Sequence, residues 1–179
     1  MGNKIQKLYD LTRKFNDISC ASKELSEEAF LQQYYYIKEE FNELAATVGD
    51  GDCNVHGKLS LEDHMLTSAL DDCIDILITT FGMLQKLENL GVDINSAAID
   101  TAMNNLSKYT SRPYVVHETV ERLAREDISA KATFNEEENC YIIRDAVTGK
   151  VKKPFDFVSN DLSKYITTEV KGNYAKHNG

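Results

Sequence analysis

The sequence contains few of the residues that interrupt helices, with two prolines and nine glycines among its 179 residues. Because proline breaks a helix and glycine weakens it, this scarcity leaves room for long helices. Basic residues are also in deficit: 20 Lys and Arg stand against 29 Asp and Glu, and the net charge is −9. A protein that binds nucleic acid through its phosphate backbone is not expected at this charge.

Other absences bear on the cellular compartment. No apolar run approaches the roughly 20 residues that a membrane-spanning helix needs. The first residues, MGNKIQKLYD, lack the apolar core of a signal peptide. The four cysteines are scattered without C-x-x-C spacing, which is typical of reduced thiols rather than of disulfides or a zinc site. We therefore expect a cytoplasmic protein that does not contact a membrane.

Hydrophobic periodicity predicts an all-α fold, a bundle of four to five helices with a small C-terminal β-hairpin. We expect a single domain over residues 1–179, with a helical core at about 4–126, the hairpin at about 138–158 and a loosely held tail after 159. The predicted helices lie at about residues 5–18, 26–49, 60–89, 94–109 and 114–125. The hairpin is predicted from CYIIRDAVTGKVKKPFDF, as two short strands around a Thr-Gly turn.

The stretch IKEEFNELA places Glu39, Glu40 and Glu43 within about one turn of the second predicted helix. Like charges at this spacing repel one another. Taken alone, the three glutamates are read as a solvent-facing side of a surface helix.

The third predicted helix changes that interpretation. Its centre, ALDDCIDILITTFGML, is apolar on most sides, which predicts a buried helix, yet it contains Asp71, Asp72 and Asp75. No Lys or Arg lies between Lys58 and Lys86 to pair with them. Because an unpaired buried carboxylate is strongly unfavourable, a metal ion is the expected partner. Ligands that are all oxygen favour Mg²⁺ or Mn²⁺.

These acids also carry a family resemblance. Glu39-Glu40-x-x-Glu43 followed by Asp72-x-x-Asp75 resembles the E-E-x-x-E … E-x-x-D signature of the MazG-like all-α nucleotide pyrophosphohydrolases, which include phosphoribosyl-ATP pyrophosphohydrolases and dimeric all-α dUTPases. The family's N-x-S-K element is matched by Asn105, Ser107 and Lys108. The hairpin sequence is similar to that of phage and bacterial members. Asp72 stands where the family has Glu, and whether Asp71 or Asp72 binds metal stays open.

The resemblance implies hydrolysis of a nucleoside triphosphate between its α and β phosphates. It assigns metal binding to Glu40, Glu43, Asp72 and Asp75, and to Glu39 either a further metal or the proton of the attacking water. Lys108 would meet the triphosphate, and Asn105 the base, sugar or phosphate. Asn16 on the first helix is a further candidate for reading the base.

The resemblance also implies a homodimer or homotetramer. The phage-like hairpin favours a purine substrate such as dGTP, by analogy alone. Two alternatives are kept: a dUTPase-type activity, and a catalytically silent helical module that senses nucleotide or binds a protein partner.

Overall fold

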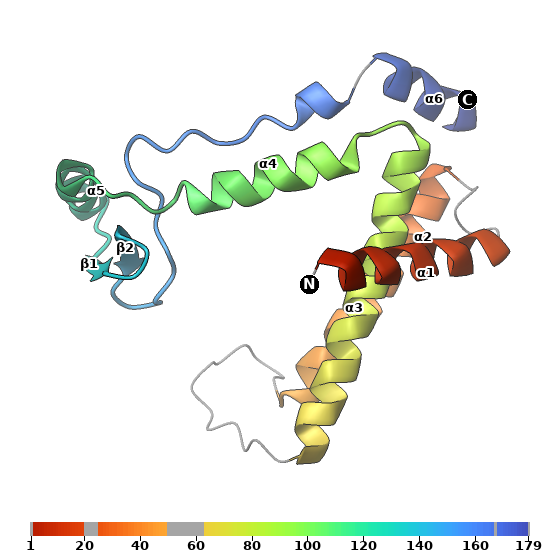
Figure 1. Ribbon diagram of the computed structural model, residues 1–179, viewed down its shortest axis with the longest axis horizontal. Coiled ribbons are helices and arrows are strands. Elements are labelled where there is room, and N and C mark those ends of the chain that lie inside the picture. Colours follow the sequence, from red (N-terminus) through yellow and green to blue (C-terminus); the bar gives the residue numbers. More distant parts are fainter. Residues whose placement is uncertain (1, 20–24, 50–62, 167, 179) are drawn as a thin grey trace. The chain divides into compact units, whose positions relative to one another are not determined.

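The computed structural model describes residues 2–19, 25–49, 63–166 and 168–178. Over these residues the protein is mainly helical, with six α-helices and one two-stranded antiparallel sheet (Figure 1), which confirms the predicted combination of helices and hairpin. No helix in the described ranges is long and apolar enough to cross a membrane. The chain forms two compact units, which we treat separately: Met1–Ile94 with Tyr165–Gly179, and Asn95–Lys164.

The first unit is organised around one central helix. It contains α1 (Gly2–Ile18), α2 (Glu27–Thr47), α3 (Asp63–Asn89) and α6 (Thr168–Asn178). Both α1 and α2 pack against α3, and Figure 1 shows α1 crossing it. The Tyr9 and Phe81 rings meet edge to face, with 5.1 Å between their centroids. The Tyr9 hydroxyl donates a 2.7 Å hydrogen bond to Glu88, so α1 contacts the C-terminal part of α3.

Local signals set the ends of these helices. The Ser26 side chain, at the first residue of the range predicted for the second helix, caps α2 by accepting a hydrogen bond from the backbone N–H of Ala29 at 3.2 Å. At the end of α3, the N–H groups of Gly91 and Val92 donate to the carbonyls of Glu88 and Leu87. This pair of hydrogen bonds needs a residue in the left-handed conformation after the helix, and Gly91 supplies it with φ +96°.

The hydrophobic core of the first unit is small. Its buried members are Leu25, Leu90 and Val170, with Phe30 and Val92 packed against them. The tail after residue 159, expected to be loosely held, contains the helix α6, which brings Val170 into this core. Asn173 on α6 also donates a 3.1 Å hydrogen bond to the Leu90 carbonyl, closing the end of α3.

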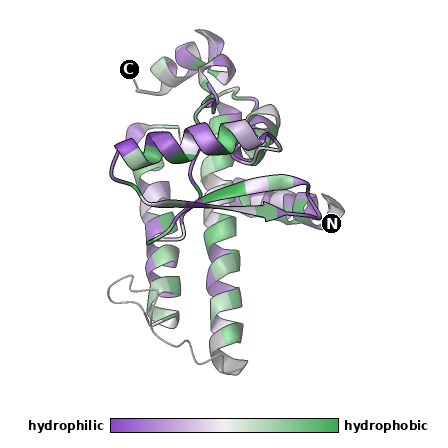
Figure 2. Ribbon diagram, turned by 90° about the vertical axis from the view of Figure 1, so that its left-hand side faces the viewer, coloured by the Kyte–Doolittle hydropathy of each residue, from purple (hydrophilic) through white to green (hydrophobic). Residues whose placement is uncertain are grey.

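Many apolar side chains remain outside this core, contrary to the expectation that α3 is buried. Leu70 on α3 is 65% exposed and Phe15 on α1 is 66% exposed, although both belong to predicted apolar faces. Figure 2 shows hydrophobic residues recurring along α3. The reason is that α1 and α2 cover only part of the circumference of α3, so its remaining apolar side faces solvent.

The second unit packs one helix on the sheet. It contains α4 (Ile94–Leu106, which starts at the boundary), α5 (Pro113–Arg125), β1 (Ala130–Asn135), β2 (Cys140–Asp145) and a short 3-10 helix at Ser163–Tyr165. Val115, Thr119 and Leu123 form the buried face of α5, and Ile143 on β2 is fully buried. The Thr119 hydroxyl donates to the Val115 carbonyl at 2.6 Å and accepts from the Phe155 N–H at 2.9 Å, which satisfies a buried polar group.

The hairpin lies earlier in the chain than predicted. β1 pairs with β2 in antiparallel register, with Ala132 opposite Ile143, and the turn between them lies at residues 136–139. Asn139 adopts φ +49° there, a conformation that Asn tolerates. The predicted turn at Thr148-Gly149 is present. The Asp145 carboxylate stabilises it by accepting hydrogen bonds from the backbone N–H groups of Val147 and Thr148. Beyond this turn, however, only an isolated bridge joins Arg144 and Val151.

The Gly91 turn yields a stability prediction. Gly91→Ala should lower the free energy of unfolding by about 1–3 kcal/mol, because a side chain makes this left-handed conformation unfavourable. The matched control is Gly172→Ala on α6, where nothing lies within 4 Å of the new Cβ and φ is not positive. That change should leave stability equal or slightly higher. Urea unfolding followed by circular dichroism measures both, and equal effects of the two substitutions would contradict the assigned role of Gly91.

Candidate metal and nucleotide site

Two hydrogen bonds fix how α2 lies against α3. The Gln33 side chain donates to the Thr79 carbonyl at 2.9 Å, and the Thr47 hydroxyl donates to the Asp72 carboxylate at 2.6 Å. The helices therefore run antiparallel. Glu40 lies midway between Gln33 and Thr47 and within about 20° of both on the helix circumference. On α3, Asp75 lies about midway between Asp72 and Thr79. Glu40 and Asp75 are therefore at about the same height along the two antiparallel helices.

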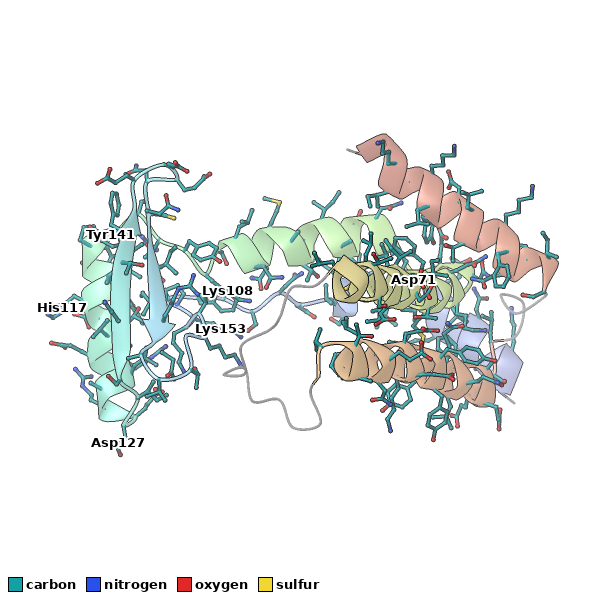
Figure 3. The ribbon with its side chains drawn as sticks, turned by 90° about the horizontal axis from the view of Figure 1, so that it is seen from below. Asp71, Lys108, His117, Asp127, Tyr141 and Lys153 are labelled. Atoms are coloured by element: carbon teal, nitrogen blue, oxygen red, sulfur yellow. The ribbon has the colours of Figure 1, made fainter. Side chains whose placement is uncertain are left out.

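The electrostatics of Glu40 show which acids gather at this level. Partial burial raises the pKa of Glu40 above its ordinary value of 4.5, and the charges of Asp75, Glu43, Glu39 and Asp72 raise it further, in that order. Five of the six acids that the sequence analysis named are thus near enough to one another for four of them to act on Glu40. Asp71 is exposed and is not among the charges that act on Glu40. Figure 3 labels Asp71 on α3 beside α2.

No cation balances these charges within the described part of the chain. Lys and Arg side chains there form ion pairs with other acids, among them Glu88, Glu121 and Asp145, but none with the five carboxylates. The one hydrogen bond recorded for the five is the one from Thr47 to Asp72. The cluster therefore carries a concentration of negative charge that a divalent cation would neutralise.

The five carboxylates suit a divalent metal ion by the type of their donor atoms, but their side chains would have to move closer together to coordinate one ion. All the donor atoms are oxygen, the type that Mg²⁺ and Mn²⁺ prefer. Their oxygens are not drawn into one tight group: among the described residues, the group whose ligand atoms all lie within 4.8 Å of one another is His117, Glu118 and Glu121. Because Glu side chains have several rotatable bonds, they can close on an ion without movement of the helices.

Asn16 lies apart from the acidic cluster. Its side-chain N–H₂ donates a 3.0 Å hydrogen bond to the Gln85 carbonyl oxygen, and the Gln85 N–H₂ donates to Asp17 at 3.2 Å. Gln85 is almost fully buried, so these bonds join α1 to α3. Ten residues separate Gln85 from Asp75, about 15 Å along the helix. Asn16 is thus engaged in helix packing at the other end of α3.

Asn105 and Lys108 lie in the second unit, at the C-terminal end of α4. The Lys108 ammonium donates a 2.6 Å hydrogen bond to the Asn105 side-chain oxygen, so these two residues of the N-x-S-K element do contact each other. Asn105 is exposed and Lys108 is partly so. Figure 3 labels Lys108.

The His117 group on α5 was not predicted from the sequence, and its surroundings argue against a metal site. All three side chains are exposed and come from a single helix. The Glu121 carboxylate also pairs with the Arg125 guanidinium at 3.2 Å. A cation would have to compete with this arginine at an open surface, where ion pairs contribute little.

A shallow hollow that is largely open to solvent adjoins Glu39 and Glu43 on α2, and sequence reasoning missed it. Its lining includes Tyr35, Lys38, Glu39, Asn42, Glu43 and Ala46. The signal was present, since these residues recur at spacings of three and four along one helix.

Comparison with known proteins gives no match: the chain matches no protein-family model, no curated protein and no solved structure. The resemblance to the MazG-like pyrophosphohydrolases therefore rests on the motifs of the chain itself.

The raised pKa of Glu40 predicts how stability depends on pH. The folded protein binds the Glu40 proton more tightly than the unfolded chain, so this residue lowers stability as pH rises from the ordinary pKa of 4.5 through the raised value. In the presence of EDTA, Glu40→Gln should therefore have a higher melting temperature than the wild type at pH 7. The difference should shrink towards pH 4, where Glu40 is protonated.

Thermal unfolding at the two pH values measures this difference. Glu137→Gln, in the exposed turn between β1 and β2, is the matched control and should not change the melting temperature at either pH. A Glu40→Gln protein that is less stable than the wild type at pH 7 would show that the cluster does not repel Glu40.

Proposed function

We propose that this protein is a divalent-metal-dependent nucleotide pyrophosphohydrolase, which hydrolyses a (d)NTP to the monophosphate and pyrophosphate. One observation carries the proposal: Glu39, Glu40 and Glu43 on α2 gather with Asp72 and Asp75 on α3, with no cationic partner in the described part of the chain. The order of these acids, E-E-x-x-E … D-x-x-D, is similar to the signature of the MazG-like family.

The roles of the residues are proposed from the resemblance, and the positions of the acids on α2 and α3 support them. Glu40, Glu43, Asp72 and Asp75 would hold Mg²⁺ or Mn²⁺, which supplies charge neutralisation at the phosphates and a water of lowered pKa. Asp72 is preferred to Asp71 because Asp72 faces α2 and acts on Glu40. Glu39, at the outer edge of the cluster, is the residue to accept the proton of the attacking water or to hold a further ion. Phosphoryl transfer depends mainly on such positioning and charge neutralisation.

The substrate contacts are proposed from the resemblance. Lys108 and Asn105 are assigned to the nucleotide because they match the N-x-S-K element, and their exposed polar groups are suited to phosphate and sugar. Asn16 receives no substrate role, because its amide holds α1 to Gln85.

We further propose that the active form is a homodimer or homotetramer. The exposed apolar side chains of the first unit support it; they include Leu11, Phe15 and Ile18 on α1 and Leu70 and Ile74 on α3. Leu11, Phe15 and Ile18 follow one another at spacings of four and three, so they share one exposed apolar face of α1, and an exposed apolar face of a helix is suited to an interface between subunits. Light scattering coupled to size-exclusion chromatography should give twice or four times the 20.2 kDa chain mass, and Phe15→Glu should lower it. A monomer at micromolar concentration would contradict this part of the proposal.

The reaction itself is tested by resolving its products. The purified protein is incubated with Mg²⁺ or Mn²⁺ and each common NTP and dNTP, and the products are separated by anion-exchange chromatography. Monophosphate with pyrophosphate is the expected outcome. Diphosphate with phosphate would indicate cleavage at the wrong position, and no turnover of any nucleotide would favour the silent binding module instead.

Four substitutions test the roles of the acids: Asp75→Asn, Glu43→Gln, Asp72→Asn and Asp71→Asn. Asp75→Asn and Glu43→Gln should each lower kcat/KM by about 100-fold or more, since even second-shell changes around a metal often weaken metalloenzymes 10- to 100-fold. Asp71→Asn is the matched control one turn away on the exposed side of α3 and should stay within about threefold of the wild type. Circular dichroism checks that each variant is folded. Loss of activity in Asp71→Asn with retention in Asp72→Asn would reverse the ligand assignment.

A further inference from the structure

The hydroxyl of Thr47 makes a different hydrogen bond from those of other helical threonines in this protein. Thr79, Thr101 and Thr119 each donate to the backbone carbonyl four residues earlier in their own helix. Thr47, the last residue of α2, instead donates to the carboxylate oxygen Oδ2 of Asp72 on α3, at 2.6 Å. This distance is short, as is typical of a hydroxyl that donates to a charged carboxylate.

Thr47 contacts Asp72 at one end of the acidic cluster. It lies seven residues after Glu40, about 10 Å along α2. Asp72 lies three residues before Asp75, about 4.5 Å along α3, and towards the same end of the antiparallel pair. Asp72 is therefore held between Thr47 and the other acids. Its second oxygen, Oδ1, accepts no hydrogen bond from the described part of the chain and is free to bind an ion.

This bond distinguishes Asp72 from the four other carboxylates of the cluster, whose side chains make no hydrogen bond within the described ranges. Carboxylates that bind metal ions are commonly oriented by a hydrogen bond from a neighbouring side chain, which improves metal affinity. A carboxylate that is oriented before the ion arrives also loses less conformational freedom when it binds. Asp72 is thus the acid that is already fixed, and the glutamates are the acids that have to close on the ion.

We propose that Thr47 is a positioning residue for the metal ion: its hydroxyl holds Oδ2 of Asp72 and so prepares Oδ1 to bind the ion. The inference rests on the proposed function for the presence of an ion at these carboxylates. It adds a residue that lies outside both acidic motifs, and it gives a physical reason why Asp72, rather than Asp71, is the ligand.

The test measures metal binding rather than turnover. Electron paramagnetic resonance of Mn²⁺ at pH 7 compares the full-length variants, and circular dichroism checks their folding. Thr47→Val keeps the shape of the side chain but removes the hydroxyl, so it should weaken Mn²⁺ binding about tenfold. Thr47→Ser keeps the hydroxyl and should stay within about threefold of the wild type. Thr47→Ala, which also lacks the hydroxyl, replaces the valine variant if that variant does not fold.

The matched control is Gln33→Met, which separates positioning from helix packing. Gln33 lies seven residues before Glu40, and its side chain likewise makes one hydrogen bond to α3, at the Thr79 carbonyl. Its loss should lower the melting temperature in EDTA but leave the Mn²⁺ affinity within about threefold of the wild type. If Thr47 only tied the two helices together, Thr47→Val would behave in the same way as this control.

A double substitution tests whether Thr47 acts through Asp72. In an Asp72→Asn protein, adding Thr47→Val should change the Mn²⁺ affinity by less than about twofold, because the carboxylate that the hydroxyl orients is already lost. A tenfold effect that persists in the Asp72→Asn protein would overturn the inference. So would an unchanged affinity in Thr47→Val, an equal loss in Gln33→Met, or a wild type that binds no Mn²⁺.

The outcomes separate this inference from the proposed function. Pyrophosphate release by a protein whose Mn²⁺ affinity does not depend on the Thr47 hydroxyl would keep the proposed function and overturn the positioning role. Mn²⁺ binding that Thr47→Val weakens and Thr47→Ser preserves, in a protein that hydrolyses no nucleotide, would keep the positioning role and overturn the proposed function.

Discussion

Repulsion between carboxylates across the α2–α3 interface is the constraint on which the rest of this protein depends. Glu40 lies between the helices with four other acids acting on it and no cation to balance them in the described part of the chain. Such a cluster lowers the stability of the helix pair by itself. Its retention in a contact region is explained if these oxygens neutralise a divalent cation. In the proposed function, that cation would in turn hold the phosphates of the substrate.

The packing around the cluster holds the helices while leaving the carboxylates able to move. Gln33 and Thr47 tie α2 to α3 on either side of Glu40, each by one hydrogen bond. Gly82 allows close approach nearby, since a Cβ there would lie only 2.7 Å from the Gln33 amide nitrogen. Farther along the chain, Gln85 secures α1 through Asn16, and the Leu90 carbonyl secures α6 through Asn173. The polar contacts thus set the register of the helices, and the small apolar core closes only the far end of α3.

The sequence predicted the helices and acidic residues of the candidate site better than it predicted which side chains are buried and which helices contact one another. The Ser26 cap, the periodicity of α2 and α3 and the five acids are local signals, so helix ends and the shared face of the glutamates could be read directly. The burial of Leu70 and Phe15 could not, because burial depends on what covers a helix, and this chain leaves those faces open. β1 was missed because a turn centred on Glu and Asn lacks the glycine that marked the other turn. The contact of Thr47 with Asp72 depends on the register of two helices, which periodicity does not determine.

The most direct test of the account is whether the carboxylates between α2 and α3 bind a divalent cation. Electron paramagnetic resonance of Mn²⁺ at pH 7 counts free and bound ions without requiring any substrate. The account predicts that the wild type binds Mn²⁺ and that the double substitution Glu40→Gln and Asp75→Asn weakens binding at least about tenfold, since ligand oxygens are lost from both helices. Absence of Mn²⁺ binding by the wild type, or binding that the double substitution leaves unchanged, would contradict it.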